Sequence, residues 1–461
     1  MSLWIRAVKV ALLEVALVGR AAGSPAGNVF NVLDYGAVGD GIALDSPAIQ
    51  RAIDAAAAAR RGAQVLAPGG HRYRVGTLEL RSGVDFHLAG DAELVISTNR
   101  SDYRGDGVIT ATGARGLSIT GTGKISGRAK DFMIRYDPEG EWWVPAEWRP
   151  KMFILTACTN LVVRDITFSE APQWGLHLVG CEDVLVDHIT IRNLLDVPNC
   201  DGIDPDHCRK VEIRRCRIVC GDDAIVIKTT RQPVDYGPSS HITVRDCVIE
   251  TQDSGLKIGT ETTQDIHHIR FEHCEIRSSN RGFTIQLRDE GNVHHIEFED
   301  ITFVSRYFAA PWWGRGEAIS LTALPRGPQT RLGSLHHVRV RNVTGRAENS
   351  ARICGVPSSR VRNVRLRNVA LTLDRWTAYP GGVFDNRPTT ALEAIEPHGT
   401  PGFCIRYADN ISLRNCSVAW GEHVPGYFSY ALEAEAVTGL SRRQFHGTAA
   451  HPGRDPAVSI R

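Results

Sequence analysis

The sequence predicts an all-β protein built as a parallel β-helix, and a repeated apolar pattern together with its spacing carries that prediction. Apolar residues recur at relative positions 0, +2, +5 and +7 in eight stretches, first at Leu161-Val163-Ile166-Phe168 and last at Ile411-Leu413-Cys416-Val418. The first six copies start at residues 161, 184, 211, 242, 269 and 296, which is 23 to 31 residues apart. Alternation with a period of two predicts strands. A repeat of this length is typical of a solenoid, whose coils stack about 4.8 Å apart.

The segment before the repeats is expected to open the solenoid and to carry its cap. Phe30-Asn31-Val32 predicts a first strand, and a helix should follow with Ser46 as its N-cap and Pro47 at its first helical position. One face of that helix should be buried, since apolar residues recur every four positions at Ile49, Ile53 and Ala57. Because the end of a β-helix exposes strand edges and apolar interior, we expect this helix to cap it.

Residues 1–27 are expected to be either a secretory signal or an N-terminal extension. Val10 to Val18 is mostly apolar and follows Arg6 and Lys9, as in a signal peptide, but Glu14 interrupts the run. The run is too short for a transmembrane helix. We therefore expect a secreted or periplasmic protein, with the cytoplasm as the alternative location, and no association with a membrane.

Composition argues against several function classes. The chain has 53 basic and 52 acidic residues and a formal net charge of +1, so there is no electrostatic case for nucleic acid. Its eleven cysteines match no zinc-binding spacing, and we expect a monomer without metal or cofactor. Disulfide pairing among Cys200, Cys208 and Cys220 stays open. Four cysteines occupy position +5 of the apolar pattern and are expected to be small interior residues, namely Cys216, Cys247, Cys274 and Cys416.

The chain is expected to divide into residues 1–27, a β-helix over residues 28–420 and a C-terminal tail over residues 421–461. Two tryptophan-rich insertions interrupt the repeat, at residues 126–150 and at residues 306–316, and the second contains Trp313. Exposed aromatic rings beside a solenoid groove suit stacking against sugar rings, whereas buried rings would anchor the insertions. The sequence leaves both interpretations open.

A second pattern recurs between copies of the first, and it predicts which side chains share one outer face of the solenoid. Each copy has a residue at position 0, then a small, an apolar, a variable and another apolar residue, beginning at Trp174, Asp201, Asp223, Ser254, Arg281 and Glu317. Positions +2 and +4 should point inward, so positions +3 and +5 point outward. The +3 column reads His177, Asp204, Val226, Lys257, Thr284 and Ser320, and the +5 column reads Val179, Asp206, Lys228, Gly259, Gln286 and Thr322.

This alignment places five carboxylates on two adjacent coils, namely Asp201, Asp204, Asp206, Asp222 and Asp223. Carboxylates this close repel one another unless they have a task or a partner. The cluster fits paired carboxylates for glycoside hydrolysis or calcium ligands for a lyase. The alternative is a set of turn-forming Asp residues bonded to backbone N–H groups.

The residues around the cluster resemble glycoside hydrolase family 28, the polygalacturonase family. Asn199-Cys200-Asp201 matches the family's Asn-Thr-Asp signature except at Cys200, and Gly221-Asp222-Asp223 matches its Gly-Asp-Asp signature. The resemblance covers about residues 28–420 and implies a right-handed, pectin-lyase-like β-helix and an inverting hydrolase. By this resemblance Asp222 is the general acid, and Asp201 with Asp223 hold and activate the water.

Two further signatures of that family are degenerate here. The Gly-His-Gly signature falls on Asp253-Ser254-Gly255, so its histidine is missing. The Arg-Ile-Lys signature falls on Thr284-Ile285-Gln286. The two cations that bind the galacturonate carboxylate in that family are therefore missing as well. A shifted cation could supply the charge, from Lys228, Lys257, Arg281 or Arg288. Otherwise Thr284 and Gln286 would hydrogen-bond a neutral sugar. The expected substrate-binding set also includes Trp174, His177, Trp313 and Glu317.

The sequence therefore predicts an inverting hydrolase of a pectin-type polysaccharide or oligosaccharide, galacturonate- or rhamnogalacturonan-like. The alternatives are a uronate lyase or epimerase on the same fold, a hydrolase for a neutral sugar, and a carbohydrate-binding or structural solenoid. Asp204-Pro205-Asp206-His207 faintly resembles a uronan epimerase motif. Whether cleavage is internal or terminal depends on how the two insertions close the groove.

Overall fold

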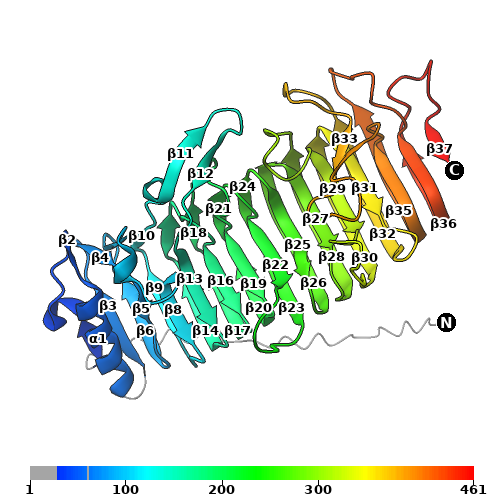
Figure 1. Ribbon diagram of the computed structural model, residues 1–461. Helices are drawn as coiled ribbons and strands as arrows, with labels where there is room; N and C mark the ends of the chain where they lie inside the picture. The colour runs from blue at the N-terminus through cyan, green and yellow to red at the C-terminus, as the bar shows by residue number, and fades with distance from the viewer. Residues whose placement is uncertain (1–27, 60–61) are drawn as a thin grey trace, which may run out of the picture.

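The protein is a right-handed parallel β-helix, as predicted, in a computed structural model that describes residues 28–59 and 62–461. A 33-stranded parallel sheet winds along the molecule, and Figure 1 shows its coils stacked from the N-terminal to the C-terminal end. The expected signal or extension at residues 1–27 lies outside the described residues. Within the described ranges, no helix combines the length and apolarity needed to cross a membrane.

The apolar pattern stacks in register, one copy per coil. The neighbours β14 (Thr159–Arg164), β17 (Glu182–Asp187), β20 (Arg209–Arg214) and β23 (Ser239–Arg245) align a column that runs Val163, Val186, Ile213, Val244. All four side chains are fully buried. Burying one such side chain stabilises the fold by about 1.5–3 kcal/mol, so every coil adds its own share of core.

The cysteines are interior residues. Cys216, Cys247, Cys274 and Cys416 are at most 2% exposed, which confirms the interpretation of position +5. All eleven cysteines are buried and free, so no disulfide joins Cys200, Cys208 or Cys220. Ten of the eleven thiols donate to a backbone carbonyl, and Cys404 is the exception.

One coil was not recognised from the apolar pattern because a glycine occupies its last apolar position. β30 (Leu335–Ala347) pairs in register with β28 (Val293–Ser305), and Gly345 lies opposite Phe303. A Cβ on Gly345 would lie 2.0 Å from the Phe303 ring. The ring of one coil therefore fills the space that a side chain of the next coil would need.

The helix α1 (Ser46–Ala58) lies at the N-terminal end of the solenoid, as Figure 1 shows. Its N-cap is Asp45, one residue before the predicted Ser46. Ser46 Oγ instead accepts a hydrogen bond from the Gly76 N–H at 2.7 Å. The Asp45 carboxylate accepts hydrogen bonds from the N–H groups of Val38 and Gly39 at 2.6 and 3.2 Å. Both side chains thus join the helix start to neighbouring loops instead of capping it.

The solenoid continues beyond residue 420, where the sequence analysis placed a tail. β36 (Leu432–His446) pairs in parallel with β35 (Phe403–Trp420), and β37 (Val458–Ile460) pairs with β36. Most side chains of β36 beyond its first three residues are exposed or half-buried. The apolar pattern fades here because the last coil has little to pack against on its outer side.

Two excursions rise from the solenoid beside the middle coils and the C-terminal coils (Figure 1). One is the hairpin β11 (Met133–Asp137) and β12 (Trp142–Pro145), which forms most of the first insertion. The other is the segment of residues 383–398 with β33 (Val383–Asp385) and β34 (Ile395–Pro397), called the covering segment below. The hairpin reaches the second insertion, because the rings of Trp142 and Trp312 meet edge-on with centroids 5.7 Å apart.

Candidate active site

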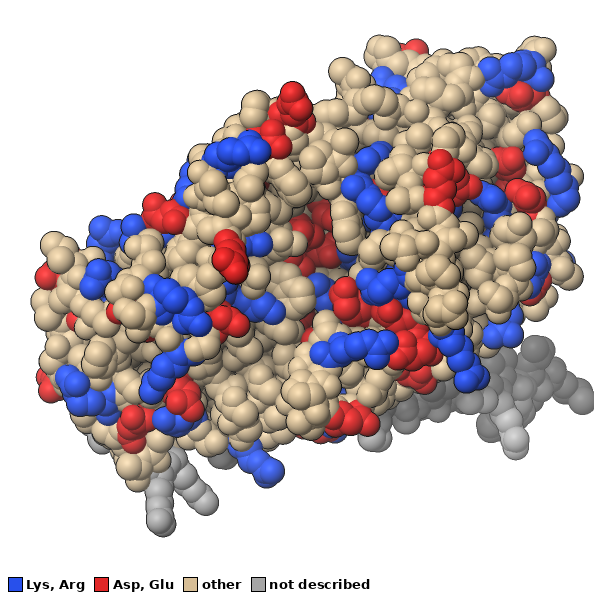
Figure 2. All heavy atoms as spheres, viewed as in Figure 1, with Lys and Arg blue, Asp and Glu red and all other residues tan. Residues whose placement is uncertain are grey.

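Three adjacent strands form the floor of a cleft. β19 (Ile203–Asp206), β22 (Ile225–Thr229) and β25 (Ser254–Thr262) lie in the predicted register, with Ile203 opposite Ile225 and Ile225 opposite Leu256. The cleft measures about 330 Å³, within the about 300–1,000 Å³ of small-ligand sites. Figure 2 shows acidic side chains gathered in a hollow in the middle of this face. The residues that line the cleft include Trp142, Trp174, Asn199, Asp201, Asp222, Asp223, Lys228, Asp253, Lys257, Glu261, Trp312 and Trp313.

The structure brings Asp201, Asp222 and Asp223 together, with one oxygen of each carboxylate within 4.8 Å of the others. Asp201 and Asp223 stand at the bends before β19 and β22, one coil apart. A glycine is required at position 202, between Asp201 and β19, because a Cβ there would lie 2.3 Å from the Ala224 carbonyl oxygen. This close approach of two coils explains the small residue in the repeated pattern.

Burial favours the protonated form of two members of the trio, Asp222 and Asp201. Burial, with the charges of Asp201 and Asp223, raises the pKa of Asp222 to about 7. Its Oδ2 accepts a hydrogen bond from the Asn199 N–H at 3.0 Å, and its Oδ1 accepts one from the Asp223 N–H at 2.9 Å. Arg149 Nη2 donates to Asn199 Oδ1 at 3.0 Å and so positions the residue that holds Asp222.

Two buried lysines face the other two carboxylates. Lys257 Nζ lies 2.6 Å from Asp223 Oδ2, and Lys228 Nζ lies 3.3 Å from Asp201 Oδ2 and 3.2 Å from Asp204 Oδ1. Burial disfavours the charge of each lysine, but the surrounding carboxylates outweigh it and raise the pKa of both. Burial and the neighbouring Asp204 raise the pKa of Asp201, against the effect of Lys228.

One oxygen of each of these two carboxylates remains available. Across residues 28–59 and 62–461, no hydrogen-bond partner is found for Asp201 Oδ1 or Asp223 Oδ1, although both atoms are buried. A buried carboxylate oxygen without a donor is costly. The pair is therefore suited to accept hydrogen bonds from a water molecule or a sugar hydroxyl.

Aromatic rings form the walls. Trp174 lies beneath two cations, with Lys151 Nζ 3.7 Å and Lys228 Nζ 3.9 Å from its ring centroid. Trp313 also lines the cleft, with Trp312 and Trp142. Trp142 contributes from the hairpin β11–β12, so both predicted insertions supply rings to the cleft. Within the second insertion Trp312 is buried and Trp313 is partly exposed, so anchoring suits the first ring and stacking on a sugar suits the second.

Several residues predicted to bind substrate are covered instead. Thr284 and Gln286 are at most 1% exposed, and Arg281, Arg288 and Glu317 are fully buried. The covering segment lies over this part of the face, where Gln286 Nε2 donates to the Arg387 carbonyl oxygen at 3.2 Å. The sequence pattern could not predict this cover, because it comes from a segment about 100 residues later in the chain.

The covered residues contact one another. Arg281 lies between three carboxylates, 3.7 Å from Asp253, 3.6 Å from Glu317 and 3.7 Å from Asp385. Arg288 Nη1 donates to Thr322 Oγ1 at 3.0 Å. Neither guanidinium lines the cleft, so the prediction that they grip a substrate carboxylate there is wrong for this arrangement.

His177 also lies outside the cleft lining. Its Nδ1 is 3.2 Å from Lys151 Nζ and its Nε2 is 3.2 Å from Asp206 Oδ2. Burial lowers the pKa of His177 to about 4, so the ring is neutral at ordinary pH. Asp206 also accepts a hydrogen bond from the Thr230 N–H at 2.8 Å, and several donors lower its pKa despite burial. Asp206 and His177 thus contact each other and their neighbours Lys151 and Thr230 instead of lining the cleft.

Sequence reasoning missed Asp253, Glu261 and Trp142 as lining residues. Asp253 precedes Ser254 just as Asp222 precedes Asp223, so its register position was readable from the repeat. Burial and the nearby Asp223 raise the pKa of Asp253 to about 8. Glu261 lies in β25 beyond the point where its register with β22 shifts, and Trp142 comes from a hairpin with no repeat of its own. Only tertiary structure could place these two.

A match to a family model decides the family. The model of glycosyl hydrolases family 28 matches residues 59–378. The chain belongs to this family. The chain spans about half the length of the first curated relatives it matches. An exopolygalacturonase of Platanus acerifolia is 28% identical over 236 residues, which is 47% of this chain and 59% of that protein.

Solved structures of the family share the fold. A hyperthermoactive exopolygalacturonase from Thermotoga maritima is similar with a TM-score of 0.65 and 22% identity, covering 75% of this chain and 87% of that one. A family 28 exopolygalacturonase from Yersinia enterocolitica is similar with a TM-score of 0.67 and 18% identity, covering 90% of this chain and 78% of that one. At these identities the likeness supports the β-helix architecture.

Proposed function

We propose that this protein hydrolyses glycosidic bonds in a pectin-type polysaccharide, with Asp222 as the general acid and with Asp201 and Asp223 holding the attacking water. The observation that carries the proposal is the difference in surroundings between Asp222 and Asp223. Asp222 has a pKa raised to about 7, whereas Asp223 lies 2.6 Å from a lysine ammonium. Such a pair separates the acid and base roles of two neighbouring carboxyl groups.

The steps follow from these positions. Asp222 donates its proton to the glycosidic oxygen as the bond to the anomeric carbon breaks. The free oxygens of Asp201 and Asp223 hold a water molecule, whose oxygen attacks the anomeric carbon. Asp223 accepts the water's proton and releases it to solvent, and Asp222 regains one from solvent. Hydrolysis then consumes one water and creates one new reducing end.

We propose that the anomeric configuration inverts, as the family resemblance implies. The nearest oxygens of the trio lie within 4.8 Å, which is nearer to the about 5–5.5 Å between carboxyl groups of retaining enzymes than to the about 6.5–9.5 Å of inverting ones, so the proposal of inversion does not rest on this distance. The free oxygens Asp201 Oδ1 and Asp223 Oδ1 favour a water molecule as the nucleophile, because both can accept hydrogen bonds from it. Proton NMR of the first-formed product distinguishes the two outcomes.

The sugar at the cleaved position is proposed to be a uronate held with the help of Lys228 and Lys257. Each ammonium has three donors and can contact a substrate carboxylate while it remains paired with Asp201 or Asp223. A neutral sugar is the second candidate, and the composition of the cleft favours it. The lining contains five carboxyl groups, from Asp201, Asp222, Asp223, Asp253 and Glu261, against two ammonium groups.

Terminal cleavage fits the shape of the groove. The covering segment lies over β27 (Arg281–Leu287), the strand next to β25, so the groove does not continue along the column beyond Lys257. A polymer could not lie across these coils. We therefore propose exo action, with the chain end bound near Lys257.

The same residues suit a calcium-dependent lyase less well than a hydrolase. A lyase needs a neutral base and a cation to acidify the substrate, but both lysines have raised pKa values and are paired with the trio. Two ammonium groups beside the carboxylates disfavour a divalent cation by repulsion.

A polymeric plant substrate also implies that the protein acts outside the cytoplasm.

A panel of pectic oligosaccharides tests the proposal. The purified protein should release new reducing ends without new ultraviolet absorbance, since hydrolysis forms no unsaturated uronate. Appearance of that absorbance would establish a lyase, and the absence of any product across acidic and neutral substrates would leave a binding protein. The Asp222→Asn variant is the matched control for contaminating activity.

A further inference from the structure

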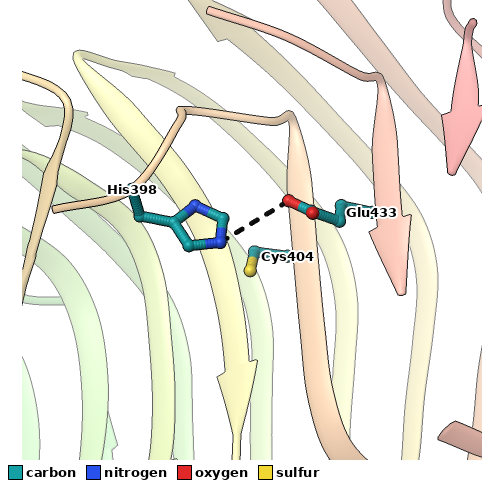
Figure 3. Close-up of side chains that lie close together, drawn as sticks. All are labelled: His398, Cys404 and Glu433. Atoms are coloured by element: carbon teal, nitrogen blue, oxygen red, sulfur yellow. Dashed lines mark ion pairs between the residues drawn. The ribbon is translucent and has the colours of Figure 1, made fainter. Parts of the chain in front are cut away.

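Three potential metal ligands meet near the C-terminal end of the solenoid, away from the cleft. His398 ends the covering segment, Cys404 lies on β35 and Glu433 lies on β36, opposite Cys404 in the strand register. A ligand atom of each lies within 4.8 Å of the others, and Figure 3 shows the three side chains converging. Cys404 is four coils beyond Lys257 in the same outward column, which is about 19 Å.

The imidazole is oriented as a metal ligand. His398 Nδ1 lies 2.6 Å from the Gly399 carbonyl oxygen. A carbonyl oxygen only accepts, so Nδ1 carries the proton and the lone pair of Nε2 is free. Such a backbone hydrogen bond from the second ring nitrogen is the usual support of a metal-binding histidine.

The separation between His398 and Glu433 suits a shared ion better than a direct contact. Nε2 and Glu433 Oε2 are 3.7 Å apart, too far for a hydrogen bond. Two ligands at about 2.0–2.2 Å from a tetrahedral zinc ion lie about 3.4 Å from each other. A lone pair and a carboxylate that face each other at this distance repel unless a cation lies between them.

Cys404 is the third ligand, and it differs from every other cysteine of the chain. The side chain is fully buried, and its sulfur is the one thiol that makes no hydrogen bond within the described ranges. Burial raises the pKa of the Cys404 thiol, although the nearby Arg352 guanidinium opposes this effect. A bound cation would replace the thiol proton and give the sulfur its missing partner.

We propose that His398, Cys404 and Glu433 bind one divalent transition-metal ion of the zinc class, with water in the fourth position. Thiolate and imidazole ligands select zinc over calcium or magnesium. On binding, the Cys404 thiol loses its proton to solvent, and no electron is transferred. The carboxylate trio is not involved, so this site is independent of the proposed hydrolysis.

The site would fasten the covering segment to the last coils. That segment supports the wall of the cleft, because Arg387 Nη2 donates to the Trp312 carbonyl oxygen at 2.6 Å and Asp385 Oδ2 accepts from the Gly314 N–H at 2.7 Å. Its other end is held by His398. The metal would therefore stabilise the wall that carries Trp312 and Trp313 without taking part in the chemistry.

Cobalt substitution tests the proposal on the intact chain. Titrating the chelator-treated protein with Co(II) should produce a thiolate-to-cobalt charge-transfer absorption that saturates at one equivalent and disappears when Zn(II) is added. Stacked surface histidines, such as His294 and His295 with Nδ1 atoms 2.7 Å apart, can also bind cobalt. They contain no sulfur, so they cannot produce this absorption.

Variants assign the absorption to the site. Cys404→Ala should abolish it, whereas the control Cys416→Ala, which removes another buried thiol, should retain it. Glu433→Gln and His398→Gln should weaken Zn(II) binding at least about 10- to 100-fold, the loss typical of altering even a supporting residue. Zn(II) should raise the Tm of the chelator-treated wild type but not that of Cys404→Ala. Absence of the absorption in the wild type, or its persistence in Cys404→Ala, would overturn the proposal.

Discussion

Replacing Lys257 by Met should both slow the reaction and move its alkaline limit. Lys257 Nζ lies 2.6 Å from Asp223 Oδ2, and both side chains are at most 5% exposed. A charge-assisted hydrogen bond of this kind contributes about 1.5–3 kcal/mol. Its loss from the step that activates water corresponds to about a 10- to 150-fold fall in kcat/KM. Methionine keeps the length of the side chain and removes the charge.

The direction of the pH effect follows from the role of Asp222. A general acid works in its protonated form, so the rate should fall as pH rises through about 7, the pKa to which Asp222 is raised. The Lys257 ammonium acts to lower that pKa. Without the ammonium, Asp222 keeps its proton to higher pH, and the alkaline limb of the profile should move upward.

The assay is the initial rate of reducing-end formation across the pH range, at a temperature below the Tm of each variant. This condition matters because breaking a buried ion pair typically costs about 3–5 kcal/mol of stability. The control is Lys210→Met, which removes an exposed lysine 2.8 Å from Glu182 on the outer surface and should leave the profile unchanged. A Lys257→Met profile whose alkaline limb coincides with that of the wild type would refute the reasoning, whatever the rate.

Three further outcomes are expected. Lys228→Met should reduce kcat/KM about 10- to 150-fold more for a uronate than for a neutral sugar at the cleaved position, and an equal loss on both would favour the neutral-sugar candidate. Incubation with EDTA should leave the initial rate of the folded protein unchanged, and a loss that calcium restores would favour the lyase. Polygalacturonate should yield one small product from the outset with little early fall in viscosity, whereas a ladder of oligosaccharides would contradict exo action.

The sequence predicts the fold well because each coil repeats the same local requirement. Val163, Val186, Ile213 and Val244 recur at one template position and stack in one buried column. Alternation with a period of two indicates burial of one side of a strand, and it does not depend on how distant segments fold. The coil at Gly345 was missed because its space is filled by Phe303 from the neighbouring coil, which no local pattern records.

The carboxylate trio could be predicted from register, but its surroundings could not. Counting along the repeat placed Asp201 and Asp223 on adjacent coils and Lys257 on the next one. The cover over Thr284 and Gln286 comes from Arg387, about 100 positions later, and Glu141 contacts Tyr379 across 238 positions. Such contacts depend on how the hairpin β11–β12 and the later segments of the chain pack against the solenoid. The ligands His398, Cys404 and Glu433 likewise come from separate segments with no common spacing.

The role of Asp222 as the general acid is the central claim, and the leaving group tests it most directly. Asp222→Asn should lower the rate on a natural oligosaccharide about 10²–10⁴-fold, the usual contribution of a general acid. On an aryl glycoside, whose phenolate leaves without protonation, the same variant should retain most of the wild-type rate. The control Asp165→Asn alters an exposed carboxylate on the outer surface and should match the wild type on both substrates. If Asp222→Asn keeps more than about a tenth of the rate on the natural substrate, or loses both activities equally, Asp222 is not the acid.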